Sequence, residues 1–270
     1  MTSLPSLLSE TPGLCFTSLL GLILGSFFNV VILRLPQGKS IVFTASHCPR
    51  CKKPLKWFHN VPVFSYLFLR GRCASCRTKI SVQYPLVEIA TAFIFGFTFY
   101  HFGFSWQWFS YTLLASMLLI ISVIDLYHQI IPDELSLSGI VIGLLFAIFL
   151  PKEDPAHVVL WWESLLGILI GGGSFLAIAL LYEKIAKREG LGGGDVKLNA
   201  MLGAWLGYQS LMVITLASTA LGSIVGVAYM LVKGKDFKAA IPFGPFMAAG
   251  AIIYLLWGER LLMLLFPTLH

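Results

Sequence analysis

Long uninterrupted apolar runs constrain this chain more than any other feature. Runs close to or above the roughly 18–20 residues that cross a bilayer recur along its 270 residues. Helices and closed barrels are the only structures that satisfy every backbone group in lipid, and continuous rather than alternating apolar runs disfavour a barrel. The sequence therefore predicts an all-α polytopic membrane protein with about eight transmembrane helices, over residues 12–33, 84–103, 106–125, 135–150, 160–182, 197–208, 209–232 and 244–266.

Positive charge is concentrated in three loops, and these loops orient the predicted helices. Of the 19 Lys and Arg residues, ten lie in residues 34–79, four in 184–197 and three in 233–238. With eight spans all three loops share one side, which should be the cytoplasm, so both termini would face outward. The first positive charge follows the first apolar run, which favours an uncleaved anchor over a signal peptide. Anionic lipid is the expected partner of these charges, and no interleaving of aromatic and basic residues indicates nucleic acid.

The long polar segment after the first predicted helix, which we call the cysteine loop (residues 34–83), contains two C-x2-C pairs. They are Cys48 with Cys51 and Cys73 with Cys76, separated by 21 residues. Two such pairs can close a tetrahedral site around one zinc ion, and four protein ligands leave no open position, so the zinc would be structural. A pair of disulfides is the alternative, which a cytoplasmic loop disfavours. Cys15 stands alone in the first apolar run and is expected to be a small core residue.

Two acids at predicted membrane boundaries are candidates for function. Asp125 ends an apolar run, where an acid opposes the helix dipole, so capping does not explain it. The alternative for Asp125 is a solvated carboxylate at a helix end. Asp195 follows the glycines Gly192 to Gly194, which permit close approach of the backbone. The alternative for Asp195 is a flexible loop with a helix N-cap, and Asp133, after Pro132, is more simply explained as such a cap.

With eight spans, Asp125 and Asp195 lie at the same membrane face. Two carboxyl groups close together in a poorly solvated site cannot both ionise easily, so one keeps a proton and the other takes one from water. Such a pair can activate water for attack on a peptide carbonyl and protonate the departing amine. The sequence provides the two acids and does not show that they meet.

Several stretches together resemble the bacterial type IV prepilin peptidases, which belong to the GxGD intramembrane aspartyl proteases. The stretches run in family order over nearly the whole chain: "GSFFNVVILRLP" (Gly25 to Pro36), the two C-x2-C pairs, "YPLVE" (Tyr84 to Glu88), "DLYHQIIPDELS" (Asp125 to Ser136), "GGGDVKLNA" (Gly192 to Ala200) and "IPFGPFMAAG" (Ile241 to Gly250). The GxGD motif alone would be weak, whereas the set is specific.

The resemblance implies an enzyme of the bacterial inner membrane with its active site facing the cytoplasm. It would remove the basic leader of type IV prepilins or pseudopilins, typically between Gly and Phe, and serve type IV pilus biogenesis or type II secretion. Asp125 and Asp195 match the catalytic aspartates, and Gly192, Gly194 and Lys197 would support the catalytic loop. Many members also N-methylate the new terminus with S-adenosylmethionine, for which Glu88 is a candidate; a boundary carboxylate paired with a nearby cation is the alternative.

The expected domains are an anchor helix at residues 1–33, the cysteine loop as a zinc domain, and a membrane bundle at 84–270 whose protease core spans about 105–232. Two other classes of protein stay open. A transporter would use the aspartates as ion sites, and a non-enzymatic assembly protein would dock a partner on the cysteine loop. Glycine pairs at four-residue spacing, Gly21/Gly25, Gly167/Gly171 and Gly222/Gly226, are expected to pack helices inside the bundle.

Overall fold

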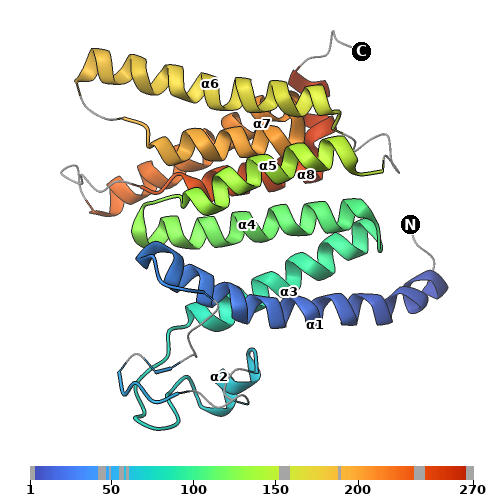
Figure 1. Cartoon of the computed structure of the whole chain (residues 1–270), viewed down its shortest axis with the longest axis vertical. Coiled ribbons are helices and arrows are strands. Elements are labelled where there is room, and N and C mark those ends of the chain that lie inside the picture. Colours follow the sequence, from blue (N-terminus) through green and yellow to red (C-terminus); the bar gives the residue numbers. More distant parts are fainter. Residues whose placement is uncertain are drawn as a thin grey trace. The chain divides into compact units, whose positions relative to one another are not determined.

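The computed structural model describes residues 4–41, 47–48, 50–54, 58, 61–151, 159–187, 190–233 and 241–265. The chain divides into two compact units, Met1–Ile120 and Ile121–His270. The first unit contains helix α1 (Leu4–Arg34), the short 3-10 helix η1 (Leu35–Gln37), α2 (Phe64–Phe68), α3 (Gln83–Phe102) and most of α4 (Trp106–His128). The second contains the end of α4 and helices α5 (Asp133–Phe149), α6 (Trp161–Ala186), α7 (Gly193–Lys233) and α8 (Gly244–Leu265) (Figure 1).

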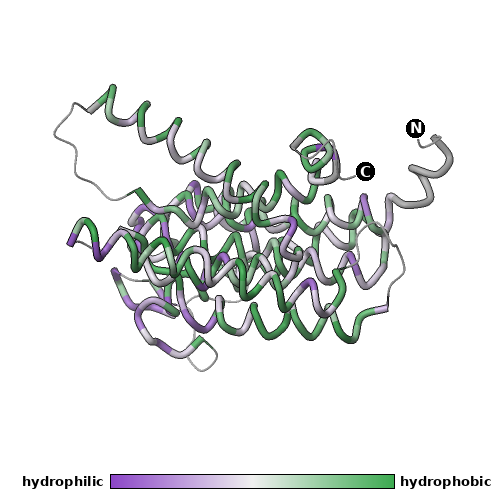
Figure 2. The backbone as a smooth tube through the Cα atoms, turned by 90° about the horizontal axis from the view of Figure 1, so that it is seen from above, coloured by the Kyte–Doolittle hydropathy of each residue, from purple (hydrophilic) through white to green (hydrophobic). Residues whose placement is uncertain are grey.

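The predicted all-α multi-pass architecture is confirmed, but the count of eight spans is not. In the described part of the chain, five helices are long and apolar enough to cross a membrane: α1, α3, α4, α6 and α7. Much of the helical backbone is apolar (Figure 2). Helix α5 has only 17 residues. Helix α8 has 22 residues, and its apolar stretch within the described side chains is Gly244–Gly258.

The two predicted segments 197–208 and 209–232 form one long element with a break. Helix α7 runs for 41 residues and is interrupted at Gly207, whose φ of 77° and ψ of 167° are not helical. A residue with a Cβ is strained at this φ, so glycine is the residue that allows the break. The Ser210 hydroxyl donates to the Gly207 carbonyl oxygen over 2.6 Å, a local contact at the start of the second half of the helix.

Helices α1 and α3 pack as an antiparallel pair through small residues. A Cβ placed on Gly21 would lie 2.7 Å from Ala92 Cα, and one on Gly25 would lie 2.7 Å from Glu88 Cα. Both distances are too short for any side chain, so the glycines are required by the close approach of the two backbones. Cys15, expected in the core, is instead exposed, because the face of α1 that meets α3 is the one bearing these glycines.

In the second unit, the first half of α7 lies between α5 and α6. On one side, Trp205 Nε1–H donates to the Gly139 carbonyl oxygen of α5 over 2.7 Å. On the other side, Asn199 Nδ2–H donates to the Gly171 carbonyl oxygen of α6 over 3.0 Å, and a Cβ on Gly167 would overlap the backbone of Gly203. The internal packing role of Gly167 and Gly171 is thus confirmed. The first half of α7 is therefore held on two sides.

The third glycine pair, Gly222 and Gly226, is not in close contact with another helix. A Cβ on Gly222 or Gly226 would lie 3.5 Å from its nearest neighbour, an ordinary contact distance. These two positions therefore do not require glycine for packing.

Candidate active site

Asp125 is a buried acid in the last turn of α4. Asp125 is only 5% exposed. Its Oδ2 accepts a hydrogen bond of 2.8 Å from the backbone N–H of Gly244. Gly244 is the first residue of α8, so the carboxylate meets the N-terminal end of a second helix, where free N–H groups and the helix dipole favour an anion. This contact explains how an acid is accommodated at a helix C-terminus that would otherwise oppose it.

The approach of α8 to Asp125 depends on a residue without a side chain. A Cβ on Gly244 would lie 2.8 Å from Asp125 Oδ2 and 3.3 Å from its Cγ. The next residue, Pro245, suits the first turn of a helix because the N–H that it lacks would have no partner within the helix. The stretch "FGPF" thus starts α8, as the sequence indicates, and also brings its first amide to Asp125.

Asp195 lies in the first turn of α7, directly after the glycine run. Its backbone N–H donates to the Gly192 carbonyl oxygen over 3.0 Å, and the Gly192 backbone N–H interacts with its carboxylate. The Asp195 and Asp125 carboxylates are close enough to interact electrostatically, and both belong to the second unit. The structure therefore brings together two acids that are separated by 70 positions in the sequence.

The three glycines before Asp195 have different surroundings. A Cβ on Gly194 would lie 2.9 Å from Ile131 Cβ, in the segment between α4 and α5, and one on Gly192 would lie 3.3 Å from Asp195 Oδ2. A Cβ on Gly193 would meet nothing within 4 Å. The first and third glycines of the run, Gly192 and Gly194, are thus close to other atoms of the site, and the middle one is not.

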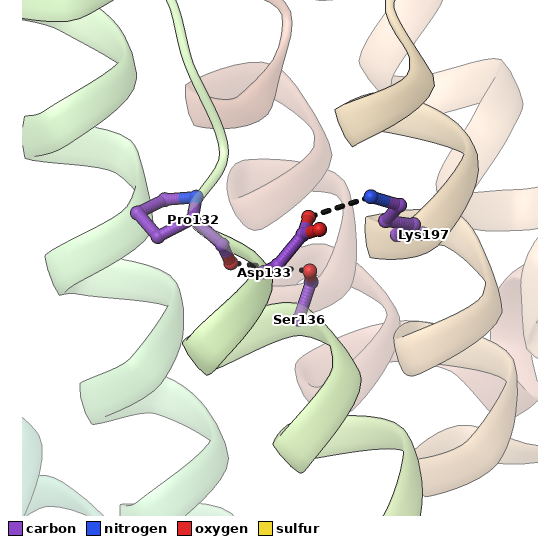
Figure 3. Close-up of polar contacts among 4 residues, drawn as sticks. All are labelled: Pro132, Asp133, Ser136 and Lys197. Atoms are coloured by element: carbon purple, nitrogen blue, oxygen red, sulfur yellow. Dashed lines mark hydrogen bonds and ion pairs between the residues drawn. The ribbon is translucent and has the colours of Figure 1, made fainter. Parts of the chain in front are cut away.

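Lys197 forms an ion pair with Asp133 at the start of α5 (Figure 3). The Lys197 Nζ lies 2.6 Å from Asp133 Oδ1, and the two side chains are 37% and 57% exposed. The expectation that Asp133 is a helix N-cap is wrong: Pro132 holds that position without a side-chain cap, and Asp133 is the first helical residue. Its carboxylate is drawn to the cation on α7, while the helix dipole still favours an acid there.

The four cysteines of the cysteine loop converge. Their Sγ atoms, from Cys48, Cys51, Cys73 and Cys76, all lie within 4.8 Å of one another. All five cysteines of the chain are free thiols in the structure, so the disulfide alternative is not adopted. Four sulfur ligands at this separation fit a single tetrahedral metal ion.

The two cysteine pairs share two backbone features. Each turn ends at a residue with positive φ, 55° at Lys52 and 56° at Arg77. The N–H of that residue donates to the carbonyl oxygen of the first cysteine, over 2.8 Å to Cys48 and 3.0 Å to Cys73. The repeated turn presents both thiols of each pair to one point, which is the arrangement that a metal ion needs.

The thiols of the cluster have unequal acidities. The backbone N–H groups of Cys76 and Ser75 lower the pKa of Cys73 to about 6. At Cys51 the Lys53 N–H lowers the pKa, but burial and the neighbouring thiols outweigh it and raise the pKa to about 11. Four crowded thiols cannot all lose their protons unless a cation balances the charge, so the donor set fits a divalent metal.

Glu88 belongs to the first unit, whereas Asp125 and Asp195 belong to the second. It is 6% exposed, and its Oε2 accepts a hydrogen bond of 2.7 Å from the backbone N–H of Val63, the residue before α2. The hydroxyl of Ser26 on α1 also bonds to its carboxylate. Glu88 therefore links the cysteine loop to α1 and α3, and its carboxylate is already engaged. This internal role was not expected from the sequence.

Two models of known protein families match the chain. Residues 19–102 match the bacterial peptidase A24 N-terminal domain, and residues 112–227 match the type IV leader peptidase family. No solved structure matches the chain.

Several curated proteins are similar over nearly their whole length, and each is named prepilin leader peptidase/N-methyltransferase. The protein from Pseudomonas aeruginosa is 38% identical over 91% of this chain and 90% of its own. Those from Xanthomonas campestris and Neisseria gonorrhoeae are 36% and 34% identical, over 94% and 88% of this chain and 95% and 88% of their own. The chain belongs to the type IV leader peptidase family.

Proposed function

We propose that this protein is a membrane aspartyl endopeptidase that removes the basic leader of type IV prepilins or pseudopilins. The observation that carries the proposal is the meeting of Asp125 and Asp195, from α4 and α7, in a chain of this family. The enzyme lies in the bacterial inner membrane with its active site at the cytoplasmic face, and it serves pilus assembly or type II secretion. The positive charge of the predicted cytoplasmic loops supports this orientation.

In the proposed mechanism the two carboxyl groups share one proton. The ionised group takes a proton from a water molecule, which attacks the carbonyl carbon of the scissile peptide bond. The protonated group gives its proton to the departing amine, so the pair ends with one proton again. The Gly244 N–H holds one oxygen of Asp125 in place, and the Gly192 N–H does the same for Asp195.

Lys197, Gly192 and Gly194 support the catalytic loop in this proposal. Gly194 lets the loop settle against Ile131, and Lys197 ties the first turn of α7 to the start of α5 through Asp133. These contacts fix the direction from which the Asp195 carboxylate approaches its partner.

We also propose that the enzyme N-methylates the new terminal residue, as the names of its relatives state for those proteins. S-adenosylmethionine would supply the methyl group. The described surroundings of Glu88 do not identify a site for this donor, because the carboxylate is buried and bound to Val63 and Ser26. Its part in methylation stays a prediction.

For the metal of the cysteine loop we propose zinc, held by Cys48, Cys51, Cys73 and Cys76 as a structural ion. Four thiolate ligands favour zinc over the hard cations calcium and magnesium, which prefer oxygen. The ion would tie the two cysteine pairs together and leave no position for water.

The test compares Asp125→Asn and Asp195→Asn with wild type in a purified cleavage assay on a prepilin, read by mass spectrometry. We expect either change to abolish leader removal while the protein stays folded. Glu183→Gln is the matched control: Glu183 is an exposed acid of α6 outside the pair and outside the contacts of the catalytic loop, and its change should leave cleavage largely intact. Cleavage by both folded active-site variants would refute the two-aspartate mechanism, and absence of cleavage by the folded wild-type protein would favour the transporter or assembly alternatives. The same spectra report methylation of the product.

A further inference from the structure

The short helix α2 of the cysteine loop exposes large apolar side chains. Phe64, Leu67 and Phe68, which we call the α2 patch, are 55%, 64% and 86% exposed. Their spacing of three and four residues places them on the same face of the helix. A cluster of this kind on a polar loop marks a surface that contacts a membrane or another protein.

The hydrogen bond of Glu88 shows the depth at which α2 begins. Val63, immediately before α2, donates to Glu88, and Glu88 is five residues beyond the first residue of α3, Gln83. At 1.5 Å per residue, Glu88 lies about 7.5 Å from that end of the helix.

The contact of Glu88 with helix α1 also places the start of α2 inside the end of a helix. Ser26, which also bonds Glu88, lies eight residues before the end of α1 at Arg34, or about 12 Å along the axis. Because α1 and α3 are both candidate membrane spans, α2 begins beside their flanks, inside their ends rather than beyond them.

The charge around the α2 patch identifies what it meets. The cysteine loop has ten Lys and Arg residues and no Asp or Glu. Arg70 and Arg72 follow α2 directly and are both exposed. Such a loop is complementary to the phosphates of anionic lipid headgroups, whereas it would repel a basic leader peptide.

We propose that the α2 patch inserts into the interface of an anionic lipid bilayer, with Arg70 and Arg72 bound to lipid phosphates. Interfacial helices insert their apolar faces by roughly 5–10 Å, which agrees with the depth of α2 beside α1 and α3. The cysteine loop is then held at the membrane surface at two places, through Glu88 on its inner side and through lipid on its outer side. This anchor does not depend on the proposed peptidase activity.

The test uses the full chain in nanodiscs and a photo-crosslinking residue, Phe68→p-benzoylphenylalanine. Phe93→p-benzoylphenylalanine is the matched control, because Phe93 is 67% exposed near the middle of α3. In discs that contain phosphatidylglycerol, we expect adducts with lipid at position 68 in a yield within about threefold of the Phe93 control. Metal content of the purified variant checks that the cysteine loop is folded. Adducts with lipid at position 93 but none at 68 would overturn the proposal, as would adducts with an added prepilin or with a second copy of the chain.

The role of charge is tested in the same assay by replacing the anionic lipid with phosphatidylcholine, and by the double change Arg70→Gln and Arg72→Gln. Each arginine near a surface of anionic lipid strengthens binding by about fivefold, so both changes should lower the yield at position 68 and leave the yield at position 93 unchanged. Equal yields in both lipids and in the double variant would refute the contribution of the phosphates.

Discussion

Replacing Gly244 with alanine tests how closely catalysis depends on the end of α8. The added Cβ would lie 2.8 Å from Asp125 Oδ2, whereas ordinary contacts begin at 3.4 Å. The carboxylate or the helix must therefore move by about 0.6 Å, and a misplacement of about 1 Å in a catalytic geometry can cost about 100-fold in rate. We expect Gly244→Ala to lower kcat by about tenfold, which corresponds to about 1.4 kcal/mol in the activation barrier.

The assay is cleavage of a prepilin by purified protein in nanodiscs, with kcat and KM measured separately and the melting temperature recorded. Gly173→Ala is the control: Gly173 lies within α6, and a Cβ there would meet nothing within 4 Å. Alanine is a better helix former than glycine, so this variant should cleave at the wild-type rate and be no less stable.

A folded Gly244→Ala protein with unchanged kcat would show that the position of Asp125 does not depend on the α8 amide, or that Asp125 does not take part in the reaction. A fall in kcat without a matching loss of folded protein would support the geometry described above. An increase in KM alone would place the effect on substrate binding instead.

Three further outcomes follow from the structure. Gly194→Ala should slow cleavage, because its Cβ would press on Ile131, whereas Gly193→Ala should be tolerated; equal activity of the two variants would refute the proposed docking of the loop. Lys197→Met should change the free energy of unfolding by no more than about 1 kcal/mol, since its ion pair with Asp133 is solvent-exposed, and should lower kcat more than it raises KM; an unchanged kcat would argue against a positioning role. A strong chelator should release the metal and make the cysteine loop more sensitive to proteolysis, because metal binding and folding are coupled; an unchanged digestion pattern after complete metal loss would contradict a structural role.

The sequence predicted the helical membrane architecture because lipid leaves the backbone few choices. It predicted the convergence of the four cysteines because two short-range pairs fix their own geometry. The electrostatic contact of Asp125 with Asp195 could be stated only as a possibility, since it depends on helices that are distant in the chain.

Other features had no readable local signal. The partner of Asp125 is a backbone amide, and every residue except proline carries one. The pairing of Lys197 with Asp133 arises because α5 and α7 begin side by side. The sequence did not indicate this pairing, since an aspartate before an apolar run is more simply explained as a helix cap. The break at Gly207 was anticipated only as a boundary between two predicted spans, since a glycine in an apolar run is also compatible with close helix packing. The internal role of Glu88 was missed because its donor is the main chain of Val63.

The hydrogen bond between Gly244 and Asp125 joins positions 119 residues apart, and this separation has a consequence for biosynthesis. A ribosome adds roughly 5–20 residues per second, so a nascent chain carries Asp125 for several seconds or longer before its amide partner has been made. The site can be completed only after the last helix has been synthesised. A chain that ended before α8 would contain both aspartates and lack the group that orients one of them, so unfinished protein would be a poor protease during membrane insertion.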